Sequence, residues 1–228
     1  MTETSYEKYI HADKILSFQK KEGELVCYGE LDFQGVQQEA EFIWTRINFM
    51  LKKIQKNLES NNIIEGVGLF YHASDLWGSL TNKTQELLKH LWPKDFLKIR
   101  KIIGEGASTA DSPRYRESEK LGRNLWSSFE NLLKLNSLTL ESLISQDRET
   151  EQYSEMRSLM SAMMWYDYRV QEFSVAHLYL VFGIIGDRTV GLKGGTTGFL
   201  IDRYQKYIFP KIWDSINNLY LDFKPVRQ

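Results

Sequence analysis

The sequence contains little cysteine, proline or histidine: one, four and four residues, respectively, among 228. The single cysteine, Cys27, cannot form an internal disulfide, and no cysteine and histidine residues have the spacing of a zinc site. No Glu-x-x-His pair of the kind that holds a di-metal centre in a helical bundle occurs either. These absences favour a reducing compartment, and we expect a cytoplasmic protein without a structural metal.

An excess of charge of one sign and long apolar runs are also missing. Lys and Arg total 29 and Asp and Glu total 30, so the formal net charge of −1 provides no overall field to attract nucleic acid or anionic lipid. The longest apolar stretch, residues 173–186, spans only about 14 residues, fewer than a membrane-spanning helix needs. The N-terminus has no apolar signal core. We therefore expect no nucleic-acid partner and no membrane partner.

The scarcity of proline leaves long segments that can form helix, and the fold class we expect is all-α. Hydrophobic residues make up 42% of the chain, so we expect residues 1–228 to form a single helical-bundle domain around one core. Residues 33–58 place apolar side chains at three- and four-residue intervals, which is the pattern of an amphipathic helix. Further helices are expected over residues 76–91, 96–103, 112–135, 156–185 and 199–219.

The segments between these helices have the composition of loops and turns. Residues 104–113 contain two glycines and small polar residues, and they end in Ser112, a residue that can cap a helix, and Pro113, which suits the first helical position. Residues 146–155 are strongly charged and are expected to form a connector or a solvated helix face. The first 20 residues are treated as an N-terminal segment.

Three kinds of side chain are candidates for a functional site, and each has a plain structural interpretation beside the functional one. His177 would lie on an apolar helix face, either hydrogen-bonded in the core or bound to haem or another metal. Arg116 follows the glycine-rich loop and is either a surface arginine or a planar donor to a carboxylate. Tyr6 and Tyr9 either pack the N-terminal segment or form the walls of a site for a flat ligand.

Three blocks of sequence resemble a known family. The first is Tyr6-Glu-Lys-Tyr9-Ile10, followed by Asp13, Leu16 and Gln19. The second comprises Asp95-Phe-Leu-Lys-Ile-Arg100, Gly104 and Ser112-Pro-Arg-Tyr-Arg116. The third comprises Phe173-Ser-Val-Ala-His177, Gly194-Gly-Thr-Thr-Gly-Phe-Leu200 and Phe209-Pro-Lys-Ile-Trp213. In this order they span most of the chain, and together they resemble the haem-dependent tryptophan 2,3-dioxygenase family.

The resemblance implies a set of roles. An all-α domain would enclose a pocket for haem b, with His177 as the axial ligand of the iron and Arg116 holding the carboxylate of the amino-acid substrate. Phe33 would line the indole pocket. The remaining implied residues also bind the substrate: either Thr196 or Thr197 near its ammonium or carboxylate group, and Tyr6, Tyr9 and Ile10 from the neighbouring subunit of a homotetramer or dimer.

One substitution separates this chain from the family pattern. Where the family has a distal histidine in a His-Gln-x-x-Glu-Leu-Trp run, the best-fitting segment here places Gln37. Glutamine can hydrogen-bond bound dioxygen or a substrate N–H group, but it cannot act as a base near neutral pH. The interval between Arg116 and His177 is also shorter than is usual in the family.

The expected activity is therefore oxygenation of an aromatic amino acid, tryptophan or an indole derivative, with dioxygen added across the indole C2=C3 bond. Two alternatives stay open at this point. Because Gln37 replaces the distal base, the reaction could instead be aromatic hydroxylation or ring rearrangement in specialised metabolism. The third interpretation is a non-catalytic helical protein that binds haem or an amino acid.

Overall fold

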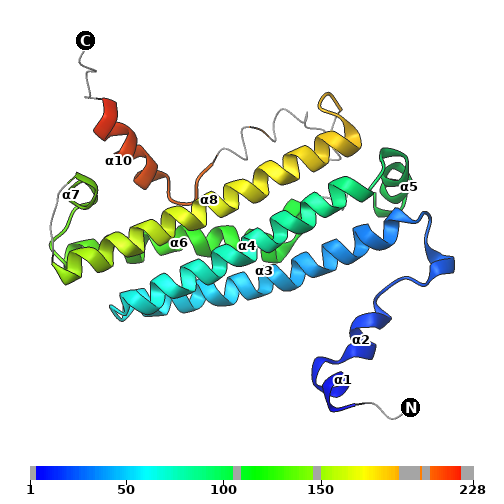
Figure 1. The fold of residues 1–228 in the computed structure, drawn as a ribbon, viewed down its shortest axis with the longest axis horizontal. Helices are drawn as coiled ribbons and strands as arrows, with labels where there is room; N and C mark the ends of the chain where they lie inside the picture. Colours follow the sequence, from blue (N-terminus) through cyan, green and yellow to red (C-terminus); the bar gives the residue numbers. More distant parts are fainter. Residues whose placement is uncertain (1–3, 105–108, 146–149, 190–200, 202–205, 222–228) are drawn as a thin grey trace.

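The computed structural model describes residues 4–104, 109–145, 150–189, 201 and 206–221 (Figure 1). Over these residues the secondary structure is helical and contains no strand, which confirms the expected all-α class. The α-helices are α1 Ser5–Ile10, α2 Ala12–Ser17, α3 Gly29–Glu59, α4 Ile63–His90, α5 Pro93–Ile103, α6 Pro113–Leu135, α7 Leu140–Ser145, α8 Glu151–Ile185 and α10 Pro210–Leu221. Two short 3₁₀ turns, η1 Glu22–Glu24 and η2 Thr109–Asp111, precede α3 and α6.

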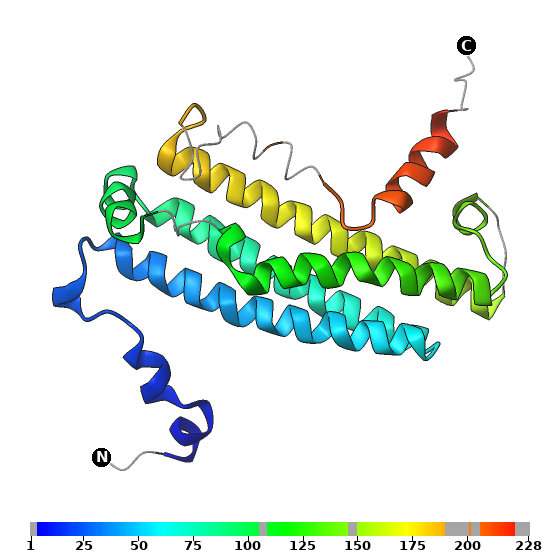
Figure 2. The same cartoon turned by 180° about the vertical axis from the view of Figure 1, so that it is seen from behind.

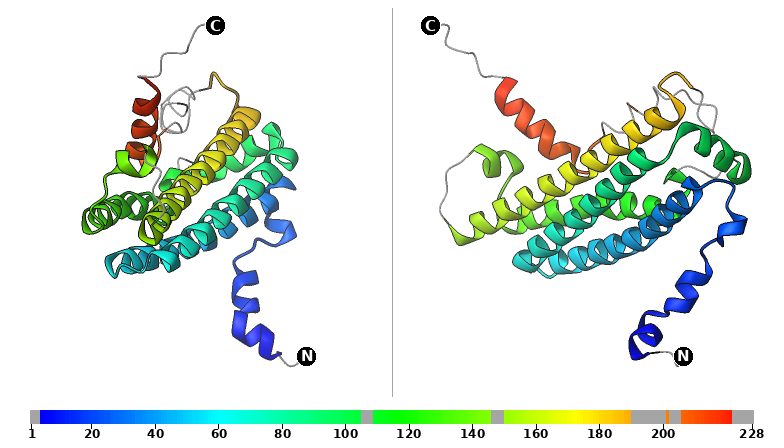
Figure 3. Two further views of the ribbon diagram at one scale, coloured as in Figure 1. Left: turned by 60° about the vertical axis from the view of Figure 1, so that its left-hand side comes forward. Right: turned by 45° about the vertical axis from the view of Figure 1, so that its right-hand side comes forward.

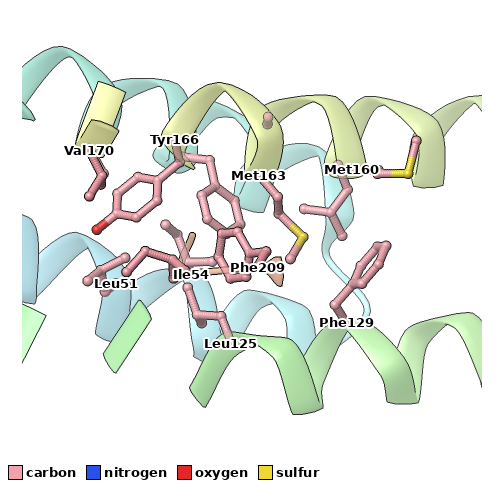
Figure 4. Close-up of a cluster of buried hydrophobic side chains, with 14 of the residues drawn as sticks. Leu51, Ile54, Leu125, Phe129, Met160, Met163, Tyr166, Val170 and Phe209 are labelled. Carbon is pink, nitrogen blue, oxygen red and sulfur yellow. The ribbon is translucent and has the colours of Figure 1, made fainter. Parts of the chain in front are cut away.

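The four long helices α3, α4, α6 and α8 lie side by side and form one bundle (Figures 1 and 2). Helix α4 packs against both α3 and α8, and α6 packs against α3. Their apolar faces meet in a shared core, so the bundle is a single helical domain. Figure 4 shows its centre, where Leu51 of α3, Phe129 of α6 and Tyr166 of α8 lie around Phe209, which precedes α10.

Local signals in the sequence predict two of these helices well. Helix α3 covers the whole of the expected residues 33–58 and adds four residues before them and one after. Helix α6 begins at Pro113, as expected, because the hydroxyl of Ser112 accepts a hydrogen bond from the Tyr115 backbone N–H at 3.1 Å. Both helices could be predicted because their signals are local: apolar spacing within one helix for α3, and a cap beside the first turn for α6.

The expected start of α4 at residue 76 was wrong, because the helix begins at Ile63 and runs through Gly66 and Gly68. Glycine disfavours helix in an isolated peptide, but here α4 turns back tightly on α3 after Asn61, which has a φ of 57°. A β-carbon added to Gly66 would lie 3.0 Å from a methyl group of Leu58. Packing between the two helices therefore outweighs the intrinsic cost of glycine.

The expected last helix, residues 199–219, was also wrong, because residues 206–209 are not helical and α10 begins only at Pro210. The buried carboxylate of Asp167 on α8 accepts hydrogen bonds from the backbone N–H groups of Ile208 at 2.7 Å and Phe209 at 3.1 Å. It also accepts a bond from Trp213 Nε1 at 2.9 Å. These bonds hold residues 208 and 209 against α8, and a sequence pattern alone does not reveal them.

The N-terminal segment projects away from the bundle, and neither α1 nor α2 buries a residue (Figure 3). It joins the bundle beyond α2, where the side chain of Lys20 pairs with Glu30 and its backbone N–H bonds to Gln34 Oε1 at 3.2 Å. None of the helices that the structure describes is long and apolar enough to cross a membrane.

Candidate functional site

A cavity of about 20 Å³ lies between α3, α4 and α8. This volume is sufficient for one water molecule. Helix α3 contributes Gln37 and Trp44 to its wall, and α8 contributes Phe173 and His177. Thr109 in η2 closes one side. The remaining lining residues are mostly apolar and come from all three helices: Val36, Ala40, Leu80, Lys83, Thr84, Leu87 and Leu180.

His177 faces this cavity in partly apolar surroundings, as its helix face predicts. Its Nε2 atom lies 3.1 Å from the hydroxyl oxygen of Thr109, so the imidazole is hydrogen-bonded in the structure. The ring of Phe173, one turn earlier on α8, lies 6.0 Å from the imidazole with an angle of 33° between the two planes. The same nitrogen that would bind a metal is thus engaged by a neutral hydroxyl group.

Gln37 also lines this cavity. It is half-buried on α3 and lies 140 positions before His177 in the sequence. Trp44 follows Gln37 by seven residues, or two helical turns, and so shares its face of α3. The bundle therefore brings together the two residues that the family resemblance assigns to the two faces of a haem.

Arg116 does not line the cavity. It is exposed on the first turns of α6, where its Nη1 atom donates a hydrogen bond to the backbone carbonyl of Ala110 at 3.2 Å. Ala110 follows Thr109, which contacts His177. Arg116 is therefore linked to the cavity through the η2 turn rather than by direct contact.

The other residues with a predicted role are not assembled around this cavity. Phe33 is buried in a second cluster beside it, with its ring 5.8 Å from that of Phe96 in an edge-to-face arrangement. Tyr6 and Tyr9 on α1 are 70% and 84% exposed, and Ile10 is half-buried at the end of that helix. Thr196 and Thr197 lie outside the described residues.

A positive charge stands at the edge of the cavity. The ammonium group of Lys83 on α4 lies 3.1 Å from a carboxylate oxygen of Glu39 and 3.3 Å from one of Glu86. The hydrogen bond with Glu39 is the main reason why the pKa of Lys83 is raised above its ordinary value, with Glu86 adding to it. Lys83 therefore stays protonated beside the cavity under all ordinary conditions.

The sequence did not single out Trp44, Lys83 or Thr109 as site residues. Trp44 could have been found from its seven-residue spacing to Gln37. No pattern in the sequence pointed to Lys83, because its helix was predicted from the apolar residues alone. Thr109 falls within a stretch with loop composition, and its contact with His177, 68 residues away, depends on tertiary structure.

The donor chemistry of the cavity fits haem, whereas its present volume does not. A haem needs an axial imidazole and apolar walls, and His177, Phe173 and Leu180 supply them. Trp44 also lines the cavity, and its indole Nε1 is buried without a hydrogen-bond partner among the described residues. A porphyrin is far larger than one water molecule, so its entry would require Thr109 and η2 to move away from His177.

Comparison with models of known protein families finds no match for this sequence, and comparison with curated protein sequences finds none either.

Proposed function

We propose that this protein is a haem-dependent oxygenase of an aromatic amino acid, tryptophan or an indole derivative, and that dioxygen is its second substrate. One observation supports the proposal most strongly. Gln37 and His177, which the resemblance assigns to opposite sides of a haem, line one cavity although 140 positions separate them. The resemblance itself uses only sequence, so this convergence is an independent argument in its favour.

In this proposal each residue has a role that its chemistry allows. His177 would hold haem b through Nε2, in exchange for its bond to Thr109. When bound, the haem supplies the oxygen chemistry, and the protein orients the substrate. Gln37 would hydrogen-bond a polar group on the opposite side through its amide, which does not titrate. Gln37 cannot accept a proton near neutral pH, so its only role would be as a hydrogen-bond partner.

Arg116 would bind the substrate carboxylate after η2 has moved. Its guanidinium now donates to the Ala110 carbonyl, a neutral acceptor on an exposed part of the protein. A carboxylate is the stronger partner for a guanidinium, because it offers a charge-assisted, two-point hydrogen bond. Displacement of η2 would thus free Nε2 of His177 and the Arg116 side chain together. The other implied substrate contacts, Phe33, Thr196, Thr197 and the Tyr6, Tyr9 and Ile10 group of a neighbouring subunit in a homo-oligomer, belong to the same proposal.

The experiment that tests this function uses haemin-reconstituted protein supplied with L-tryptophan, dioxygen and a reductant. Mass spectrometry of the product distinguishes ring cleavage with two added oxygen atoms from hydroxylation, which adds one. Either product supports an oxygenase, and the second favours the hydroxylase suggested by Gln37. Absence of any oxygenated aromatic product, with tryptophan and with substituted indoles, would contradict the proposal.

The role of Arg116 is tested by a matched pair of variants. Arg116→Leu should weaken the tryptophan-induced change in the absorption spectrum while leaving haem binding unaltered. Arg114→Leu is the control, because Arg114 is also exposed on α6 but pairs with Glu41 at 3.1 Å. Equal tryptophan affinity in the two variants would remove Arg116 from the site.

A second candidate function is a non-catalytic helical protein that binds haem or an amino acid. The bond between His177 and Thr109 and the small cavity favour it, because both are typical of a histidine satisfied within a core. Haem uptake without turnover of any aromatic amino acid would support this candidate.

A further inference from the structure

Helix α5 lies at one end of the bundle, and its outer side is strongly basic (Figures 1 and 2). Its inner side is fixed by Phe96 and Ile99, which are 6% and 0% exposed and pack in a hydrophobic cluster with residues of α3 and α8. Lys94, Lys98 and Lys101 follow one another at intervals of four and three residues, so they form a stripe on the side of α5 that points away from this cluster. All three are exposed. We call this stripe the basic face of α5.

The positive charge at this end of the molecule is a local excess. Residues 89–104 contain five Lys or Arg residues and a single Asp, which gives this segment a formal charge of +4 in a chain whose total is −1. Asp95 pairs with Lys98 at 3.2 Å, and neither Lys94 nor Lys101 has an ion pair within the part of the chain that the structure describes. The total charge, from which we expected no membrane partner, therefore conceals a cationic surface.

Large apolar side chains are exposed beside these lysines. Trp92, which immediately precedes α5, is 71% exposed, and Leu97 and Ile102 on α5 are 54% and 52% exposed. Leu97 precedes Lys101 by one helical turn and so lies next to the basic face. Lysine combined with tryptophan and aliphatic residues on one exposed surface is typical of helices that lie in the headgroup region of a membrane.

We propose that the basic face of α5, together with Trp92, Leu97 and Ile102, binds the surface of a bilayer that contains anionic phospholipids. A cluster of about four to eight Lys or Arg residues on a helix is attracted to the negative potential of such a surface. The ammonium groups would contact the anionic headgroups, and the apolar side chains would enter the boundary with the acyl chains. Nucleic acid offers the same negative charge but no apolar layer for Leu97 and Ile102. The inference does not depend on haem binding.

Sedimentation of the full chain with phospholipid vesicles tests the charge contribution. Wild type should bind vesicles that contain phosphatidylserine, bind vesicles of phosphatidylcholine alone only weakly, and dissociate at high salt. Lys94→Gln with Lys101→Gln should lower the partition coefficient about thirtyfold, because each lysine near an anionic membrane contributes about fivefold. The control, Lys53→Gln with Lys56→Gln, removes the same charge at two exposed positions in the last turns of α3 and should bind like wild type.

Quenching of tryptophan fluorescence by brominated phospholipids tests the apolar contribution. Vesicles that contain phosphatidylserine and brominated phosphatidylcholine should quench wild type and Trp165→Phe, which alters a 43% exposed tryptophan on α8, but should quench Trp92→Phe much less. Equal quenching of the two variants, equal binding by the two lysine double variants, or no binding of wild type at low salt would overturn the proposal. Tighter binding to a DNA oligonucleotide than to the anionic vesicles would overturn it as well and would assign the basic face to nucleic acid.

Discussion

At the residue scale, the hydrogen bond between Thr109 and His177 determines what the cavity can do. It occupies the imidazole nitrogen that the proposed function assigns to iron. In the structure the imidazole is satisfied by the Thr109 hydroxyl. Under the proposed function, haem would have to replace this partner, and the free energy of the bond to Thr109 would lower the affinity for haem.

Thr109→Val should increase haem affinity if the proposed function is correct. The substitution preserves the shape of the side chain and removes a hydrogen bond worth about 1 kcal/mol, so the dissociation constant should fall about fivefold. Thr84→Val is the control, because the Thr84 hydroxyl also lies near the cavity but bonds to the Leu80 carbonyl at 2.9 Å. Unchanged haem affinity in Thr109→Val would show that this hydroxyl does not compete for the site.

Asp167 gives a prediction for stability against pH. Burial raises its pKa from an ordinary value of 3.8 to about 6, despite hydrogen bonds from Trp213 and two backbone N–H groups. Between these two values the folded protein binds the proton more tightly than the unfolded chain. The resulting stabilisation is fully present below pH 3.8 and is lost as the pH rises through about 6.

This behaviour is measured as the difference in free energy of unfolding between wild type and Asp167→Asn. The difference should fall, by at most about 3 kcal/mol, as the pH rises from 3.8 to about 6. Asparagine does not titrate, so other carboxylates cancel in the comparison. A difference that grows over this range would mean that the three donors, and not burial, set the pKa.

At the scale of elements, two of the three glycines of α4, Gly68 and Gly78, have opposite surroundings. A β-carbon added to Gly68 would meet nothing within 4 Å, whereas one added to Gly78 would lie 1.6 Å from Nη2 of Arg169. Arg169 passes over Gly78 from α8 and pairs with Glu172. The absence of a side chain at Gly78 therefore leaves room for the Arg169 guanidinium between α4 and α8.

Alanine substitutions at these two glycines should have different effects on stability. Gly68→Ala should raise the free energy of unfolding by up to about 1 kcal/mol through helix propensity alone. Gly78→Ala should give no such gain, because it expels Arg169 from its position beside Glu172 and Trp165. Chemical denaturation measures both, and Arg169→Ala in the Gly78→Ala background should recover the gain. Equal stabilisation by the two single variants would contradict this account of α4 and α8 packing.

The elements also show how far a sequence alone can go. The spans of α3 and α6 follow from apolar spacing and from a cap, both of which are local properties. The early start of α4 depends on the fit of Gly66 against Leu58, and the late start of α10 depends on bonds to Asp167, 41 and 42 residues away. Neither contact leaves a periodic trace in the sequence.

At the scale of the whole molecule, the bundle places Gln37 and His177 together but leaves Arg116 outside the cavity. The resemblance alone selects Gln37, whereas His177 and Arg116 are also indicated by an apolar helix face and by the preceding glycine-rich loop. None of these signals gives the position of η2. Thr109 and Lys83 complete the site and were not predicted, because neither belongs to a spacing pattern. The helical class of the chain could therefore be predicted from the sequence, whereas the contact of Thr109 in η2 with His177 could not.

Removal of residues 1–12 should leave the bundle folded. Helix α1 buries no residue, so the midpoint of thermal unfolding should stay close to that of the full chain. If Tyr6 and Tyr9 close the site of a neighbouring subunit, turnover of the aromatic amino acid should nevertheless fall. Full turnover in the shortened chain would exclude a role for this segment.

The most direct test of the proposed function is titration of the full chain with haemin, followed by its absorption spectrum. Wild type and His72→Ala, which alters an exposed histidine on α4, should both develop the sharp Soret band of histidine-ligated haem. His177→Ala should lose stable haem binding while its helical content, measured by circular dichroism, stays unchanged. Equal haem occupancy in the His177→Ala and His72→Ala proteins, or no uptake by wild type, would contradict the proposal that this cavity is a haem site.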